Sequence, residues 1–143
     1  MPRVFLRRKG FAAFAKRAVD AYAQAVMLVL DKIISDRGSK YAVSGAPCRD
    51  ADEAATLLAE LKRTKKFAKA THNTWGLIGA DGPVKNDDGE SGAGMIILQM
   101  LEREELYEHL VVVTRWYGGK HLGGDRFRHV TEAVRIYLDA LKR

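Results

Sequence analysis

Apolar side chains recur at helical spacing in four segments of the chain, with polar residues between them. The segments span residues 11–31, 50–66, 95–106 and 127–141. Apolar positions three and four apart place one hydrophobic face along a helix, so each segment predicts an amphipathic helix. Asp50 and Glu53 at the start of the second segment form a capping-box pattern, and the basic run Lys62–Lys69 lies at its end. We expect each helix to pack its apolar face on a shared core.

Shorter apolar runs between these segments predict strands. They are Ile33–Ser35, Ser39–Ala46, Thr71–Ile78, Val84–Lys85 and residues 109–116. The Asp36-Arg37-Gly38 triplet lies between the first two runs and Gly79–Pro83 between the third and fourth, where turn-forming residues indicate hairpins. Because hairpins alternate with helices in the order α-ββ-α-β(β)-α-β-α, the sequence predicts an α+β fold.

The length and the charge limit the number of domains and the class of partner. A chain of 143 residues is long enough to bury a core and fits one domain. We divide it into a basic helical extension over 1–32 and a globular domain over 33–143. The formal net charge of +6 favours anionic partners such as RNA, DNA or acidic protein surfaces. A cationic surplus also supports solubility alone, so the charge does not define a site.

The cysteine content and the N-terminal charges bear on the compartment. Cys48 is the single cysteine, which excludes an internal disulfide and makes a reducing compartment, the cytoplasm, the default. Six cations precede the first acid, Asp20, and resemble an organellar presequence, so targeting to an organelle stays open. The apolar run Ala25–Leu30 is far too short to span a bilayer, and we expect no membrane insertion.

The densest group of carboxylates is Asp87-Asp88-Gly89-Glu90, shortly before the helix predicted over 95–106. The free N–H groups and the dipole at a helix start favour negative charge, which is the structural interpretation of this loop. In the functional interpretation, Asp88 and Glu90 bind a hard cation or act as an acid and base pair. The four histidines share no metal-ligand spacing, and no serine or cysteine has a nucleophile context. We therefore expect no metal, no cofactor and no nucleophilic catalysis.

The segment VVVTRWYGGKHLGGDRFRH, residues 111–129, combines an apolar strand, two glycine pairs and a cluster of cations. Glycine lets the backbone turn or approach another group closely. Trp116 and Tyr117 stand beside the cations, and alternation along a strand points one of them inward and leaves its neighbour exposed. Such a surface suits RNA bases and phosphates, and it equally suits a protein interface.

Three blocks of the sequence closely resemble the signature blocks of the IMPACT/YigZ family. They are THNTWGLI at 71–78, NDDGESGAG at 86–94 and VVVTRWYGGKHLGGDRF at 111–127, and they occur in this order. SKYAVSGAPC is similar to the family's opening strand and KKFAKATHN to the lysine-rich approach to its His-Asn pair. The resemblance therefore covers at least Ser39–Leu141. RWYGG followed by LGGDRF resembles the eukaryotic variant of the motif.

The resemblance implies the fold of the second domain of small-subunit ribosomal protein five. That fold is a β-sheet with helices packed on one face, to which helix 11–31 would be an addition. The resemblance also implies a link to translational control, because eukaryotic members compete with the amino-acid-starvation kinase for that kinase's ribosome-associated activator. These 143 residues contain neither the RWD domain of eukaryotic members nor the ferredoxin-like domain common in bacterial ones. The resemblance supplies no role for helix 11–31.

The positions shared with the family form the candidate functional surface. They are His72, Asn73, Asp88, Gly89, Glu90, Arg115, Tyr117, Gly118, Gly119, Gly123, Asp125 and Arg126. The candidates for contact with nucleic acid are Arg115, Lys120, Arg126 and Arg128. Our leading hypothesis is a non-enzymatic interaction domain that binds RNA, the ribosome or a translation-associated protein through the surface Arg115–Arg128.

Two other hypotheses stay open. An enzyme would act on a phosphorylated or nucleotide ligand between the loops 87–90 and 118–124. Its acid and base pair would come from His72, Asp88 or Glu90, with Arg115 as the electrostatic partner. If Asp88 and Glu90 instead cap their own helix and pair with Arg115 or Arg126, this polar set is structural. Alternatively, helix 11–31 and the surface 115–128 would dock a protein partner or a second copy of the chain, and the sequence leaves both the partner and the oligomeric state open.

Overall fold

The computed structural model describes residues 27–142. Five strands form one antiparallel sheet in the order β1-β2-β5-β3-β4. The strands are β1 (Leu28–Asp36), β2 (Ser39–Pro47), β3 (His72–Gly79), β4 (Gly82–Asn86) and β5 (His109–Trp116). The helices are α3 (Ala51–Leu61), α4 (Lys65–Ala68), α5 (Ala93–Arg103) and α6 (Asp125–Leu141). The predicted strands over 71–78 and 109–116 and the helices near 95–106 and 127–141 are confirmed.

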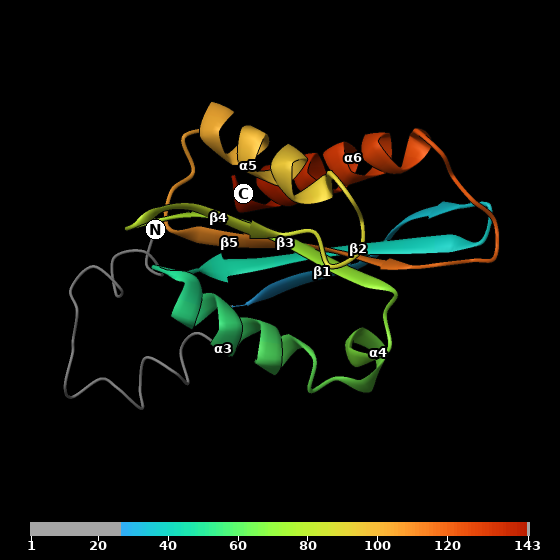
Figure 1. Ribbon diagram of the computed structural model, residues 1–143, viewed down its shortest axis with the longest axis horizontal. Coiled ribbons are helices and arrows are strands. Elements are labelled where there is room, and N and C mark those ends of the chain that lie inside the picture. The colour runs from blue at the N-terminus through green and yellow to red at the C-terminus, as the bar shows by residue number, and fades with distance from the viewer. Residues whose placement is uncertain (1–26, 143) are drawn as a thin grey trace.

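Both faces of the sheet are covered, and Figure 1 shows α5 and α6 on one side with α3 and α4 on the other. Successive side chains of a strand point to opposite faces. In β5, Val111 and Val113 pack in the core under α5 and α6, whereas Leu110 and Val112 pack in the core under α3 and α4. The unbroken apolar run of β5 reflects this burial on both sides. The predicted α+β class and the helices packed on one face are confirmed, and the opposite face carries a second helical layer.

The helix predicted over 50–66 is two helices with a turn between them. Asp50 caps α3 as expected, since its side chain accepts a hydrogen bond from the Glu53 backbone N–H at 3.0 Å. The chain then turns at Lys62–Thr64 and begins the four-residue helix α4. The turn lets Phe67 of α4 enter the core under α3, where its ring lies 5.3 Å from that of Trp116. Burial of one aromatic ring therefore overrides continued helical periodicity.

The end of the helix predicted over 11–31 is wrong, because Leu28 already belongs to strand β1. The strand pairs antiparallel with β2 from Leu28 opposite Gly45 to Asp36 opposite Ser39, with an irregularity between Leu30 and Ile34. Leu28 and Leu30 alternate toward the core with the period of a strand, whereas the helix was predicted from the spacing of four between Val26 and Leu30. The rest of that helix, and residues 1–26 of the predicted extension, lie outside the described residues. The boundary between extension and domain stays a prediction.

Between residues 27 and 142, every helix is too short or too polar to cross a lipid bilayer.

Candidate functional site

The predicted site residues gather at one end of the sheet, where the β1–β2 turn meets the segment between β5 and α6. Figure 1 shows this turn beside the chain that leads into α6. The two backbones touch, since a Cβ placed on Gly118 would lie 2.0 Å from the carbonyl carbon of Gly38. The Gly118 N–H also donates to the Ser39 hydroxyl at 3.2 Å. Only glycine fits at position 118 without displacing the β1–β2 turn.

Glu90 is the centre of the site and is only 3% exposed. Its carboxylate accepts hydrogen bonds from Arg115 Nη1 at 3.1 and 3.2 Å and from Arg126 Nη1 at 3.2 Å. Arg115 is 5% exposed, and its Nη2 donates to the Ser39 hydroxyl at 3.4 Å. Two guanidinium groups around one carboxylate compensate the cost of burying these charges. One polar cluster thereby joins β5, α6 and the start of β2 to residues 87–90, which we call the acidic loop.

His72, Asn73 and Asp88 form a second set of internal contacts. The Asn73 backbone N–H donates to Asp88 Oδ2 at 2.7 Å. The Asn73 side-chain amide donates to the Phe67 carbonyl at 3.1 Å and accepts from the Thr114 hydroxyl at 2.7 Å. His72 Nδ1 lies 2.8 Å from the Asp88 carbonyl oxygen, which only accepts, so Nδ1 is the donor. These bonds attach the acidic loop to β3 and β3 to β5.

Asp87 confirms the structural interpretation of the acidic loop. Its two carboxylate oxygens accept from the backbone N–H groups of Gly92 and Gly94, at 3.1 and 2.8 Å, where α5 begins. Lys85 Nζ lies 3.1 Å from Oδ1. Partial burial alone would raise the pKa of Asp87, but the hydrogen bonds from both glycines and from Lys85 outweigh it and lower that pKa. A carboxylate at this helix start therefore satisfies donors that would otherwise have no partner.

The residues named for acid and base chemistry thus make contacts that fix the fold. Asp88 and Glu90 accept hydrogen bonds from β3, β5 and α6, and Arg115 is committed to Glu90. Within residues 27–142, no three side chains of His, Cys, Asp or Glu are gathered as a metal site requires. Ser39 was not among the predicted residues, because a serine after a turn carries no sequence signal for its partners Arg115 and Gly118.

The outward part of this region is the loop surface, which we define as Tyr117, Lys120, His121, Arg126 and Arg128. Tyr117 is 44% exposed, and its ring centroid lies 5.9 Å from that of His121. Lys120, His121 and Arg128 are exposed, and Arg126 is partly covered. Apart from its chain neighbours, no group of residues 27–142 lies within 4 Å of a Cβ placed on Gly119, Gly123 or Gly124. At these glycines the loop surface is therefore not covered by another described segment.

Most cations near the loop surface are matched by carboxylates. Arg37 pairs with Asp36 and with Asp125, and Arg128 Nη2 lies 3.3 Å from Asp125 Oδ1. His129 Nε2 lies 2.7 Å from Asp36 Oδ2. Hydrogen bonds from Arg37 and His129 lower the pKa of Asp36, and those from Arg37 and Arg128 lower the pKa of Asp125. The Asp36-Arg37-Gly38 turn is thus part of the site, although the sequence indicated only a hairpin there.

Asp36→Asn is expected to destabilise the protein at neutral pH and to matter less in acid. A carboxyl whose pKa is lowered on folding stabilises the native state above its unfolded pKa, about 3.9. That contribution is lost as the pH falls through the folded pKa. The difference in unfolding free energy between wild type and Asp36→Asn should therefore shrink below about pH 4. Urea unfolding at stepped pH measures it.

Asp139→Asn is the control for this pH series, because Asp139 is exposed and forms no ion pair with a described residue. The difference in unfolding free energy between wild type and Asp139→Asn should not shrink in the same way as the pH falls. If the Asp36→Asn difference stays constant down to about pH 2, Asp36 does not gain its stabilisation as a carboxylate.

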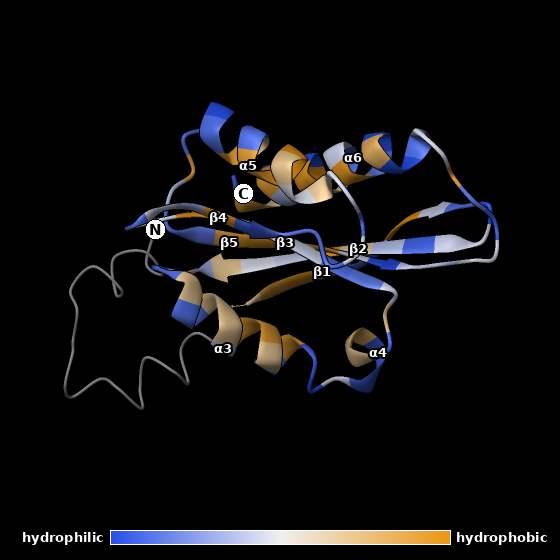
Figure 2. Ribbon diagram, viewed as in Figure 1, coloured by the Kyte–Doolittle hydropathy of each residue, from blue (hydrophilic) through white to orange (hydrophobic). Residues whose placement is uncertain are grey.

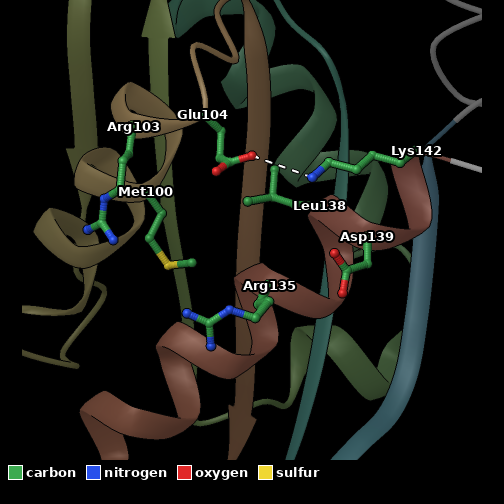
Figure 3. Close-up of a pocket in the computed structure, with 7 residues that line it drawn as sticks. All are labelled: Met100, Arg103, Glu104, Arg135, Leu138, Asp139 and Lys142. Atoms are coloured by element: carbon green, nitrogen blue, oxygen red, sulfur yellow. Dashed lines mark ion pairs between the residues drawn. The ribbon is translucent and has the colours of Figure 1, made fainter.

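A separate pocket of about 180 Å³ lies between α5 and α6. Figure 3 shows its lining side chains, which come from the ends of the two helices. They are Met100, Arg103, Glu104, Arg135, Leu138, Asp139 and Lys142. Its charges are mixed, and Lys142 Nζ lies 3.7 Å from Glu104 Oε1. None of the predicted site residues contributes to it.

Comparison with known proteins places this geometry in a family. The model of the Impact N-terminal domain matches residues 37–138. The protein IMPACT homolog of Saccharomyces cerevisiae is 36% identical over 109 residues, which are 71% of this chain and 42% of that protein. The chain thus spans less than half the length of this relative.

Two solved structures are also similar. A crystal structure of a hypothetical protein superposes with a TM-score of 0.62 at 22% identity and covers 77% of this chain and 56% of its own. This likeness concerns the fold. The two-domain translational regulator Yih1 is 30% identical, with a TM-score of 0.47, over 76% of this chain and 44% of its own. The family match from Arg37 to Leu138 includes every predicted site residue, and the chain belongs to the Impact N-terminal domain family.

Proposed function

We propose that this chain is a translation-associated interaction domain that binds a protein partner through the loop surface. Membership of the family supports the association with translation, which the sequence resemblance implied. The observation that carries the proposal is Tyr117, a large side chain that stays 44% exposed although its backbone is anchored. Exposed aromatic residues in fixed positions are typical anchors of protein interfaces.

Tyr117 is oriented by contacts beneath it. Its backbone N–H donates to the Thr71 hydroxyl at 2.8 Å. The Arg115 guanidinium lies 5.7 Å from the centre of the Tyr117 ring, within the range of a cation–π contact, while Arg115 itself is fixed by Glu90. Little freedom is left for this side chain to lose on binding, so more of its contact energy contributes to affinity.

The charge near Tyr117 favours a protein over a nucleic acid at this surface. Four arginines, Arg37, Arg115, Arg126 and Arg128, are paired with three carboxylates, Asp36, Glu90 and Asp125. Phosphate binding depends on cations that are free to replace counterions. Among the lysines and arginines of the loop surface, only Lys120 forms no ion pair with a described residue. Arg126 also lies 4.3 Å from the Phe127 ring, an aromatic and arginine combination that protein interfaces favour.

Tyr117→Ala is expected to weaken binding to ribosomes that retain their associated proteins. Truncating an anchor of this kind costs about 2 kcal/mol, or roughly 30-fold in affinity. Co-sedimentation of the full chain with crude ribosomes measures the loss, and ribosomes stripped by a high-salt wash provide the second arm. The loss caused by Tyr117→Ala should be present with crude ribosomes and absent with stripped ones, because the partner is a protein.

Tyr107→Ala is the matched control, since Tyr107 is 45% exposed and precedes β5 at the far end of that strand. It should bind as wild type does. Equal binding by wild type and Tyr117→Ala on crude ribosomes would contradict the proposal. A loss of the same size on stripped ribosomes would show that the loop surface contacts ribosomal RNA or a core ribosomal protein instead.

A further inference from the structure

A second surface carries more unmatched positive charge than the loop surface. We call it the α4 patch, and its cations lie on β2, after α3, and on and directly after α4, on the face of the sheet that holds the half-buried Trp116. The cations are Lys40, Lys62, Arg63, Lys65, Lys66 and Lys69. Figure 2 shows the connection between α3 and α4 as a hydrophilic segment at the end of that helical layer. The proposed function makes no use of this surface.

Trp116 joins the parts of the α4 patch. Its indole N–H donates to the Lys66 carbonyl at 3.0 Å, and Lys66 Nζ lies 5.4 Å from the centre of its ring. The ring packs against Phe67 of α4 at 5.3 Å. On the neighbouring strand, Lys40 is directly opposite Trp116 in the register of β2 with β5. Lys40 of β2 and Lys66 of α4 thus both lie beside Trp116.

The charges of the α4 patch are mostly left unmatched by the described chain. Lys66 pairs with Asp31, and Arg63 pairs with Glu60 at 3.3 Å. The four other cations, Lys40, Lys62, Lys65 and Lys69, are exposed and form no ion pair with a described residue. Six cations against two carboxylates leave an excess of four positive charges. Such an excess is the electrostatic requirement for binding a chain of phosphates.

The α4 patch and the loop surface lie on opposite faces of the sheet. Alternation along β5 directs Arg115 toward Glu90 on the face of α5 and α6, and Trp116 toward Phe67 on the face of α3 and α4. Figure 1 shows α4 on the side of the sheet away from α6. A ligand on the α4 patch therefore leaves the loop surface free for a protein.

We propose that the α4 patch binds single-stranded RNA. Unpaired lysines beside an aromatic ring are the combination that single-strand sites use, with backbone phosphates on the cations and bases against the ring. A flexible strand also follows cations that lie on two strands and a short helix better than a straight duplex does. The choice of RNA over DNA rests on the proposed association with translation, whereas the binding of phosphates rests on the charges alone.

The test compares the salt dependence of RNA binding between the wild-type chain and Lys65→Gln/Lys69→Gln. The probe is a labelled oligouridine of about 12 nucleotides, within the range of single-strand sites. Each phosphate contact adds about 0.7 to the slope of log affinity against log salt for a single strand. The double variant should therefore have a slope shallower by about 1.4. Between about 50 and 200 mM salt, wild type should lose roughly sevenfold more affinity than the variant does.

The control is Arg103→Gln/Arg135→Gln, which removes the same charge from the pocket between α5 and α6 (Figure 3). It should keep the wild-type slope. Equal slopes for all three proteins would overturn the proposal, as would tighter binding of duplex RNA or of an oligodeoxythymidine than of oligouridine, or full competition by a poly-glutamate chain. Tyr117→Ala should bind oligouridine as wild type does. The proposal for the α4 patch can therefore be contradicted independently of the proposal for the loop surface.

Discussion

Glu90→Ala is expected to lower the free energy of unfolding by about 3–5 kcal/mol. The substitution leaves the Arg115 guanidinium buried among Ser39, Tyr41 and Tyr117 without a counter-charge. A buried charge that loses its partner keeps the cost of leaving water and gains nothing in return. Arg126 loses the same partner but is partly exposed and is rehydrated at little cost. Urea unfolding at neutral pH measures the loss.

Glu132→Ala is the control for the Glu90 experiment. Glu132 pairs with Arg135 at 3.5 Å on the surface of α6, where both side chains are more than half exposed. Its loss should change stability by no more than about 0.5 kcal/mol. Replacing both buried partners, as Glu90→Leu with Arg115→Met, should recover most of the stability, since apolar pairs of similar volume often replace buried ion pairs well. A loss below about 1 kcal/mol for Glu90→Ala would show that Arg115 reaches solvent.

The predictability of the fold differed between elements for physical reasons. Strand β5 was found at its observed ends because five apolar or β-branched residues in a row, from Leu110 to Thr114, admit one structure when both faces are buried. The strand predicted at Ile33–Ser35 is part of β1, but residues 28–31 were mistaken for the end of a helix, because Leu30 follows Val26 at the helical spacing of four. The ladder with β2, a tertiary contact, decides that case.

In the candidate site, too, tertiary contacts decide what the local sequence pattern leaves open. The sequence blocks identified Glu90, Arg115 and Arg126 as a set, but they did not decide between pairing of these side chains with one another and a role in chemistry. Their pairing depends on tertiary contacts, because Arg115 and Arg126 follow Glu90 by 25 and 36 residues along the chain. The basic run Lys62–Lys69 was read as the end of one helix. The turn before α4 places part of it beside Trp116, and no local pattern predicts that contact.

Gly118→Ala is expected to destabilise the protein by about 3 kcal/mol, near the upper end of what overpacking costs. The new Cβ would lie 2.0 Å from the Gly38 carbonyl carbon and 2.4 Å from the Ser39 nitrogen, both backbone atoms. A side chain can rotate away from a new methyl group, but backbone must move as a unit. The β1–β2 turn therefore has to move away from the chain segment that follows β5. The contacts of Ser39 with Arg115 and Gly118 weaken together.

Gly124→Ala is the matched control, because among residues 27–142 no group beyond its chain neighbours lies within 4 Å of its Cβ position, and its φ of −67° suits any residue. Urea unfolding should show a change within about 0.5 kcal/mol for Gly124→Ala. If Gly118→Ala unfolds as wild type does, the two backbones are not in contact in solution.

At temperatures where it remains folded, Gly118→Ala should also bind crude ribosomes less tightly, while its binding of oligouridine stays unchanged. This separation is expected because Gly118 supports the base of Tyr117, whereas the cations of the α4 patch lie on the opposite face of β5.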